Sequence, residues 1–244
     1  GKSLSDVVSL IKNAKNKVVE ITITRDNQEK TMKVTRTTVD MPYTSSKVYE
    51  ENGKKIGYLK IEMFSNNITK QVKKELESLK KKNIDKLVID VRDNPGGYLT
   101  QVTEILSLFM TKKDVIYQLQ TKNNKEKVYS TSSKATYSYP VVVLINENSA
   151  SASEILASAF KETYNAEIVG VNSYGKGTVQ KTGDLNNGDT IKYTVQKWLT
   201  PKGNWINEKG VTPTKEVKLE LKENEILTED NDNQLKTAIE LASK

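Results

Sequence analysis

The sequence has 244 residues, 36% hydrophobic and 28% charged, which is enough for one large domain or for one domain with a fragment of another. Its formal charge is +7, and almost all of its basic residues are lysines; the arginines are Arg25, Arg36 and Arg92. Because nucleic-acid recognition favours the forked arginine side chain, this composition indicates a lysine-rich solvated surface and no nucleic-acid partner. The absence of cysteine and histidine excludes disulfides, thiolate sites and a Ser-His-Asp triad, and it disfavours zinc hydrolysis.

The first 43 residues predict a small α/β piece. The spacing of apolar residues favours a helix over 7–14 with Ser5 as its N-cap, a strand over 19–23 and a second strand over 32–34. Pro42 and the polar residues 44–46 then indicate a boundary.

From residue 47 the pattern alternates between strands and helices. Apolar runs predict strands at 56–63, 87–91, 141–145, 168–171 and 190–198. Helical spacing predicts helices within 68–79, 102–109, 155–159 and 235–241. Such alternation implies a layered α/β domain, assigned here to 44–222, followed by a C-terminal tail and helix at 223–244. No apolar run approaches the roughly 18–20 residues needed to cross a bilayer.

A serine-rich segment, residues 146–154, joins a buried strand to a helix and is the first candidate for chemistry. A hydroxyl there would lie at the carboxyl end of the sheet, beside the free amides of a helix N-terminus, which can stabilise developing negative charge. Alternatively, these serines only cap the helix. Spacing alone does not choose among Ser149, Ser151 and Ser153.

A second candidate is the glycine pair in residues 93–97, which follows another buried strand. Paired glycines between a strand and a helix can turn their N–H groups into a common concavity that would serve as an oxyanion hole. A plain tight turn is the alternative for the same residues.

The third candidate is Lys176, which lies between two glycines. With no histidine present, a hydrolase would need a Lys, Asp, Glu or Tyr base. A lysine base must be neutral, which requires burial, and Gln180 on the following strand could orient the amine without adding negative charge. The alternative is an ordinary surface-loop lysine.

Together, residues 92–97, 149–154 and 175–180 resemble the motifs of the C-terminal processing, or tail-specific, serine protease family. The order and separation of the motifs match that family over about residues 45–220. The resemblance implies a layered β/α protease core of the crotonase-like or ClpP-like sandwich type. It also implies a Ser/Lys catalytic dyad.

The resemblance carries site residues with it. It implies Ser151 as nucleophile, Lys176 as general base and Gln180 as the residue that orients the lysine. It implies an oxyanion hole formed by the backbone N–H groups of Gly97 and Ala152.

Two implications are less direct. Some family members have an important acid eleven residues after the serine, where Glu162 stands here. Residues 1–43 resemble the end of a PDZ module, whose carboxylate-binding loop and strand should precede Gly1.

The implied function is that of a serine endopeptidase that cleaves protein C-terminal tails through an acyl-enzyme, with no metal or cofactor. The implied partners are protein or peptide substrates and a second copy of the chain, with the helix after Asp230 as a candidate dimer contact. Family members usually work outside the cytoplasm. Because Gly1 is not an initiator methionine, any targeting segment is expected upstream.

Two other functions fit the same fold. One is a non-proteolytic ligand-binding module that carries lipophilic molecules. The other is a crotonase-like enzyme that stabilises an enolate of an acyl-CoA. Neither requires a serine and a lysine at this spacing, so a fluorophosphonate probe and a thioester-turnover assay would distinguish them from the protease.

Overall fold

The computed structural model describes residues 2–13, 15, 17–37, 41–222 and 225–244. The chain divides into two compact units, Gly1–Met41 and Pro42–Lys244. Among the helices in the described ranges, none is both long enough and apolar enough to cross a membrane.

The N-terminal unit consists of a helix and a β-hairpin, at the positions that the apolar spacing predicts. Its elements are α1 (Leu4–Asn13) and the antiparallel strands β1 (Val18–Arg25) and β2 (Gln28–Thr35). The predicted N-cap is wrong. Ser5 lies inside α1, and it is the Ser3 hydroxyl that accepts a hydrogen bond from the Asp6 nitrogen at 3.2 Å.

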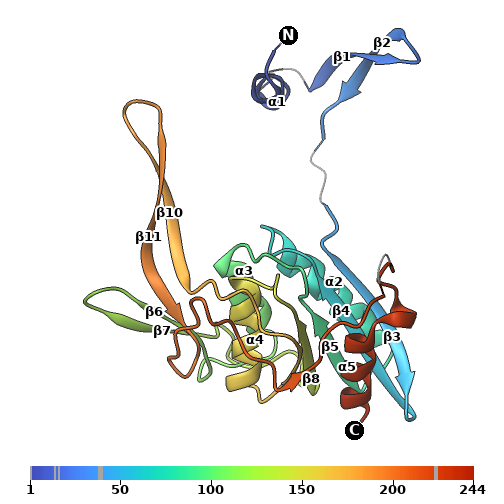
Figure 1. Cartoon of the computed structure of the whole chain (residues 1–244), viewed down its shortest axis with the longest axis vertical. Coiled ribbons are helices and arrows are strands. Elements are labelled where there is room, and N and C mark those ends of the chain that lie inside the picture. The colour runs from blue at the N-terminus through green and yellow to red at the C-terminus, as the bar shows by residue number, and fades with distance from the viewer. Residues whose placement is uncertain (1, 14, 16, 38–40, 223–224) are drawn as a thin grey trace. The chain divides into compact units, whose positions relative to one another are not determined.

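The second unit is built on a six-stranded sheet with strand order β12-β9-β8-β5-β4-β3 (Figure 1). Neighbouring strands are parallel, except that β3 pairs antiparallel with β4 at one edge. The strands are β3 (Thr44–Glu51), β4 (Lys54–Ile61), β5 (Lys86–Asp90), β8 (Val141–Ile145), β9 (Glu167–Gly170) and β12 (Lys215–Glu216). Residues 44–46, predicted as part of a boundary, therefore begin an edge strand.

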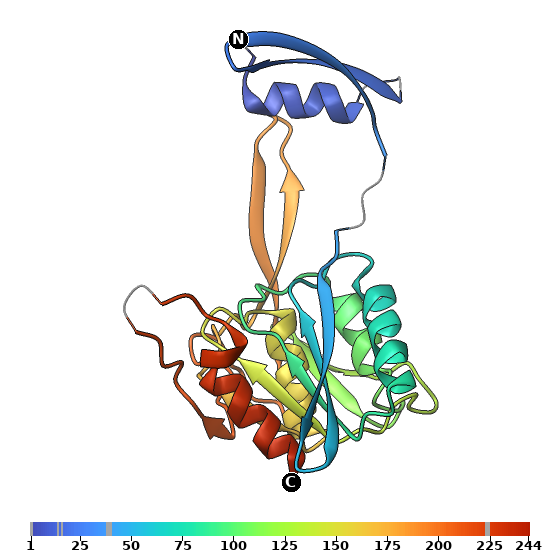
Figure 2. The same ribbon diagram turned by 90° about the vertical axis from the view of Figure 1, so that its right-hand side faces the viewer.

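Helices cover both faces of this sheet, which explains the nearly continuous apolar runs of its central strands. The helices are α2 (Ile68–Lys81), α3 (Leu99–Leu106), α4 (Ala152–Glu162) and α5 (Asn233–Ser243), with a short 3-10 turn η1 (Glu229–Asn231) before α5. Leu87 and Ile89 of β5 belong to the core shared with α2, α3 and α4. Val88 between them packs with Leu235 and Ala238 of α5, the red helix of Figure 2. The predicted layered α/β arrangement is confirmed.

A second, antiparallel sheet has the order β10-β11-β6-β7. Its strands are β6 (Val115–Gln120), β7 (Lys125–Tyr129), β10 (Thr178–Asp184) and β11 (Thr190–Leu199). The β10–β11 hairpin extends away from the body of the unit (Figure 1). The sequence alone does not predict β3, β6, β7 and β12. Strands β3, β7 and β12 are edge strands with mostly polar side chains, whereas the apolar run of β6 (Val115–Tyr117) is only three residues long.

Strands β5, β8 and β9 are adjacent and parallel. Their carboxyl ends therefore lie at one edge of the sheet, where α/β folds place their sites. The loops that follow them are residues 91–98, 146–151 and 171–177. All three segments singled out in the sequence thus meet at this edge.

Candidate active site

The structure separates the three serines that spacing could not. Ser149 and Ser153 are 0% exposed, and their hydroxyls donate to the carbonyl oxygens of Val91 at 2.8 Å and Asn94 at 2.9 Å. Ser151 is only half-buried. It is therefore the serine of the three that a substrate can reach.

The backbone of Ser151 is held in an uncommon conformation. Its φ of 55° and ψ of −111° lie outside the regions that residues with a side chain ordinarily adopt. The residue is the N-cap of α4, between a buried strand and a buried helix. Strain of this kind persists only where the surroundings fix it, and it is common at functional sites.

The paired glycines pack directly against this serine. A methyl group built on Gly96 would lie 2.9 Å from the Ser151 Cβ and 3.0 Å from the Ala152 nitrogen, so only a glycine permits this approach. Asn94 holds the two loops together, because its carbonyl accepts from the Ala150 nitrogen at 3.0 Å and its side-chain oxygen accepts from the Gly96 nitrogen at 2.9 Å.

Gly97 forms an isolated parallel bridge with Phe64. The flanking groups make the bonds: Phe64 N donates to Gly96 O, and Tyr98 N donates to Phe64 O, each at 2.9 Å. In a parallel bridge of this pattern, the N–H of Gly97, between the two bonded residues, points away from Phe64. Within the described ranges, neither the Gly97 N–H nor the Ala152 N–H donates a hydrogen bond. One free donor therefore lies in each of the two loops that pack against each other at Gly96 and Ser151.

A buried carboxylate joins the serine loop to the lysine loop. Glu154 is 0% exposed, and its Oε2 accepts from the Ser151 nitrogen at 2.8 Å and from the Lys176 nitrogen at 2.9 Å. Its Oε1 accepts from Ser173 Oγ and the Gly175 nitrogen, both at 2.6 Å. The backbone N–H groups of Ser151 and Lys176 thus donate to the same oxygen atom.

The sequence reading missed this role of Glu154. Ser151-x-x-Glu154 is a capping-box spacing, which could have predicted the contact with the Ser151 nitrogen. No local signal predicts the contacts with residues 173–176, because these residues belong to the loop that follows another strand, β9.

The lysine loop is held from its other side by a residue of β11 and by residues of the segment that follows β11. The Lys176 carbonyl accepts from Trp198 Nε1 at 2.6 Å, and the Gly177 carbonyl accepts from Trp205 Nε1 at 2.9 Å. The Gly177 nitrogen donates to Asn207 Oδ1 at 3.1 Å. Lys176 itself is half-buried, and no described hydrogen bond joins its amine to Ser151. In enzymes without substrate, catalytic hydrogen bonds are often long and tighten only in the complex.

Gln180 lies on β10, opposite Thr194 and directly after a bulge at Val179. Its side chain is exposed, and no hydrogen bond joins it to Lys176 among the described residues. The predicted strand placement is met, but this structure does not bring the amide to the lysine.

Glu162 is the last residue of α4, whereas Ser151 precedes its first residue. An eleven-residue helix is about 16 Å long, so the structure does not bring Glu162 to the serine. Its carboxylate instead accepts from the Lys202 nitrogen at 2.7 Å and holds the turn after β11.

Asp93 shapes the loop that carries the glycine pair. It has a φ of 61°, and its Oδ1 accepts from the side-chain amides of Asn146 and Asn148, each at 2.8 Å. Burial, the largest effect, raises the pKa of Asp93, but these hydrogen bonds and nearby lysine and arginine charges outweigh it, so the pKa is lowered. In the part of the chain that the structure describes, no group of three acidic side chains could hold a metal ion.

A protein-family model described as peptidase family S41 matches residues 55–217, which include all three loops. Carboxy-terminal processing protease CtpB of Bacillus subtilis (strain 168) is 40% identical over 220 residues, which are 89% of this chain and 46% of that protein. CtpA of the same organism is 34% identical over 222 residues, 91% of this chain and 47% of that protein.

Among solved structures, the photosystem II D1 C-terminal processing protease aligns with a TM-score of 0.66 and 26% identity, over 82% of this chain and 55% of that one. The chain spans about half the length of the curated relatives it matches. The family model nevertheless covers most of the second unit and every loop of the site. The chain belongs to peptidase family S41.

Proposed function

We propose that this chain is the catalytic part of a serine endopeptidase that cleaves protein C-terminal tails. One observation carries the proposal: the Glu154 carboxylate accepts hydrogen bonds from the backbone N–H groups of both Ser151 and Lys176. The free N–H groups of Gly97 and Ala152 lie in the two loops that pack against each other at Gly96 and Ser151. A nucleophile, a base and an oxyanion hole are the three parts that acyl transfer requires.

In the proposed mechanism, neutral Lys176 takes the proton of Ser151, whose Oγ attacks the scissile carbonyl. The N–H groups of Gly97 and Ala152 stabilise the resulting oxyanion. The lysine then protonates the leaving amine, and water hydrolyses the acyl-enzyme. Burial of Ser149 and Ser153 supports the choice of nucleophile.

Gln180 belongs to this proposal as the orienting residue, although its side chain is exposed on β10. Strand β10 begins two residues after Lys176, and the orienting role requires that the Gln180 amide moves to the lysine amine. Glu162 is left out of the mechanism, because α4 separates it from the serine.

The substrate class rests on the relatives, which are named as carboxy-terminal processing proteases. By the same resemblance we propose protein tails with small or apolar ends as substrates and a location outside the cytoplasm. We also propose that the core is of the crotonase-like or ClpP-like type and that the helix and hairpin of the first unit are the end of a PDZ module.

A homodimer remains a proposal of the resemblance. Helix α5, the candidate contact, packs Leu235, Ala238 and Ala242 on the sheet of its own chain. A contact with a second copy would therefore use the other side of this helix.

The test is digestion of an unfolded protein, with fragments identified by mass spectrometry. Cleavage near the C-terminus is expected for the wild type and should be lost in Ser151→Ala and in Lys176→Ala. Ser149→Ala and Ser153→Ala should retain cleavage. Undiminished cleavage by Ser151→Ala would rule the proposal out. The matches named above are peptidases and give no support to a ligand carrier or an acyl-CoA enzyme.

A further inference from the structure

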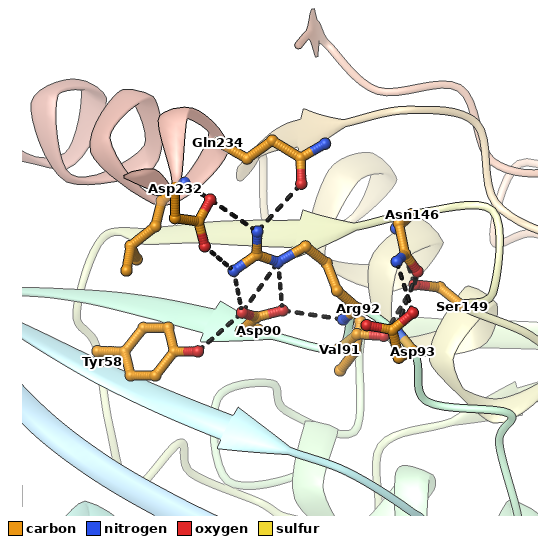
Figure 3. A network of polar contacts seen from close by, with 10 residues as sticks. Tyr58, Asp90, Val91, Arg92, Asp93, Asn146, Ser149, Asp232 and Gln234 are labelled. Atoms are coloured by element: carbon orange, nitrogen blue, oxygen red, sulfur yellow. Dashed lines mark hydrogen bonds and ion pairs between the residues drawn. The ribbon is translucent and has the colours of Figure 1, made fainter. Parts of the chain in front are cut away.

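A buried arginine lies between two carboxylates at the carboxyl end of β5 (Figure 3). Arg92 Nη2 lies 2.7 Å from Asp90 Oδ2 and 2.7 Å from Asp232 Oδ2, and Nη1 lies 2.9 Å from Asp232 Oδ1. Gln234 Oε1 accepts from Nη1 at 3.0 Å. Arg92, Asp90, Asp232 and Gln234 are all at most 5% exposed.

The two carboxylates are far apart in the sequence. Asp90 ends β5, whereas Asp232 is the N-cap of α5, where its Oδ1 also accepts from the Leu235 nitrogen at 2.8 Å. Gln234 in turn donates to the Val217 carbonyl at 2.8 Å. The arginine therefore ties the C-terminal helix to the strand that leads into the site.

A second carboxylate is not needed to neutralise the arginine. Asp90 already bonds Arg92 through Nε and Nη2, and the Tyr58 hydroxyl donates to Asp90 at 2.8 Å. Burial disfavours the charged guanidinium most strongly, but both carboxylates outweigh it, and the pKa of Arg92 is raised. Buried ion pairs are weak evidence for stability, because the cost of desolvating the charges can exceed their attraction.

The arrangement that Arg92 fixes is the loop of the oxyanion hole. The Arg92 nitrogen donates to Asp90 Oδ1 at 2.9 Å, and the next residues reverse direction through Asp93, whose φ is 61°. Asn94 follows at once, and its two oxygens bond the Gly96 nitrogen and the Ala150 nitrogen. A displacement of Arg92 would therefore move Asn94, two residues further along the chain, and with it both the glycine loop and the serine loop.

We propose that Asp232 is a positioning residue for the protease site: it holds Arg92 from the C-terminal helix and thereby sets the loop that presents the Gly97 N–H. This inference rests on the proposed function. It makes the segment around residue 232, which lies beyond the matched residues 55–217, part of the working enzyme.

Asp232→Asn tests the proposal without uncapping α5, because asparagine is as good an N-cap as aspartate. The substitution removes the negative charge beside Arg92 and replaces one of the two acceptor oxygens with an amide NH₂ group. We expect kcat for a peptide substrate to fall by about tenfold to a hundredfold, as for a small misplacement of a catalytic group, with a much smaller change in KM. Asp232→Glu, which retains the carboxylate, should recover part of the loss.

The matched control is Leu235→Ala, at the same end of α5. Leu235 is 4% exposed, belongs to the apolar cluster that contains Val88 of β5 and Leu144 of β8, and has no polar side-chain atom to bond Arg92. It should lower Tm but leave kcat close to wild type when both variants are assayed well below their Tm. Equal kcat losses in the two variants, or wild-type kcat in Asp232→Asn, would overturn the inference. A wild type with no peptidase activity would instead refute the proposed function.

Discussion

The lysine loop of the candidate site leads directly into the β10–β11 hairpin, but the site loops and the hairpin are held very differently. The serine and lysine loops are fixed by buried side chains, above all Glu154 and Asn94, neither of which is exposed to solvent. Strand β10 begins two residues after Lys176, and among the described strands it pairs only with β11. Most side chains of the hairpin are exposed.

The difference shows what positions the proposed chemistry. Regular strand pairing extends through the hairpin without burying it, whereas the irregular loops are fixed by a few polar atoms in the interior. Buried polar groups are costly when they lose a partner. Changes in the site loops should therefore be severe, and changes in the hairpin should be mild unless they touch Lys176.

The largest effect is expected for Glu154→Gln. All four groups that bond this carboxylate are donors, so an amide NH₂ in place of one oxygen must face two of them. Each buried group left unsatisfied costs about 1–3 kcal/mol, and the serine and lysine loops would separate. We expect a lower free energy of unfolding in urea titrations and a fall in kcat/KM of about a hundredfold or more.

The control for Glu154 is Glu162→Gln, at the far end of the same helix. Its carboxylate makes only surface contacts with residues 202–204, so both stability and turnover should stay near wild type. Similar losses in the two variants would show that the carboxylate shared by the two loops has no special role.

A large effect is also expected for Gly97→Ala. A Cβ at Gly97 would lie 2.2 Å from the Phe64 carbonyl oxygen, and its φ is 144°, so the loop must move. Loss of one oxyanion donor costs about 10²–10³ in kcat. Gly53→Ala is the control, because Gly53 also has a positive φ, of 73°, but a Cβ there meets nothing within 4 Å. It should cost stability only, and equal kcat losses would refute the oxyanion assignment.

Substitutions of Gln180 test whether the hairpin reaches the site. If the amide contacts Lys176 during turnover, Gln180→Glu places a carboxylate beside the amine and favours its protonated form. The rising limb of the kcat/KM profile against pH should then move to higher pH, while Gln180→Ala lowers turnover with a smaller displacement. Lys181→Glu, one residue further along β10, should leave the limb in place. An unmoved limb in Gln180→Glu would remove Gln180 from the mechanism.

The smallest effect concerns acid stability. Because the pKa of Asp93 is lowered in the folded chain, its stabilising contribution is present above the unfolded value of about 3.9 and is lost as the pH falls through the folded value. Asparagine tolerates the positive φ at this position. In Asp93→Asn, the free energy of unfolding should therefore depend less on pH below about pH 4 than it does in the wild type. Unfolding titrations between about pH 2.5 and 6 measure it. An unchanged curve would show that the loop does not depend on the charged carboxylate.

The sequence predicted the parts of the fold that bury apolar side chains on both faces. Residues 87–91 and 141–145 were correctly assigned to strands because their apolar runs are almost unbroken. Strands β6 and β7 were missed because their partners, rather than their composition, define them. The cap of α1 was assigned to the wrong serine, since Ser3 and Ser5 are equally suitable by residue type.

The candidate site was predictable to the level of its loops. Each loop follows a buried strand, so sequence order and strand direction were enough to bring them to one edge. The contacts that fix the loops were not predictable: Glu154 bonds residues some twenty positions away, and Asp232 meets Arg92 across 140 positions. Such pairs depend on the packing of the whole sheet.

The most direct test of the account is the reaction of the wild type with a fluorophosphonate, followed by peptide mapping. We expect modification of the Ser151 hydroxyl, at a rate that falls steeply in Lys176→Ala and in Glu154→Gln. Ser149→Ala and Ser153→Ala should be labelled at the same position as the wild type. Labelling at another residue, or undiminished labelling of Ser151→Ala, would contradict the claim that Ser151 is the nucleophile.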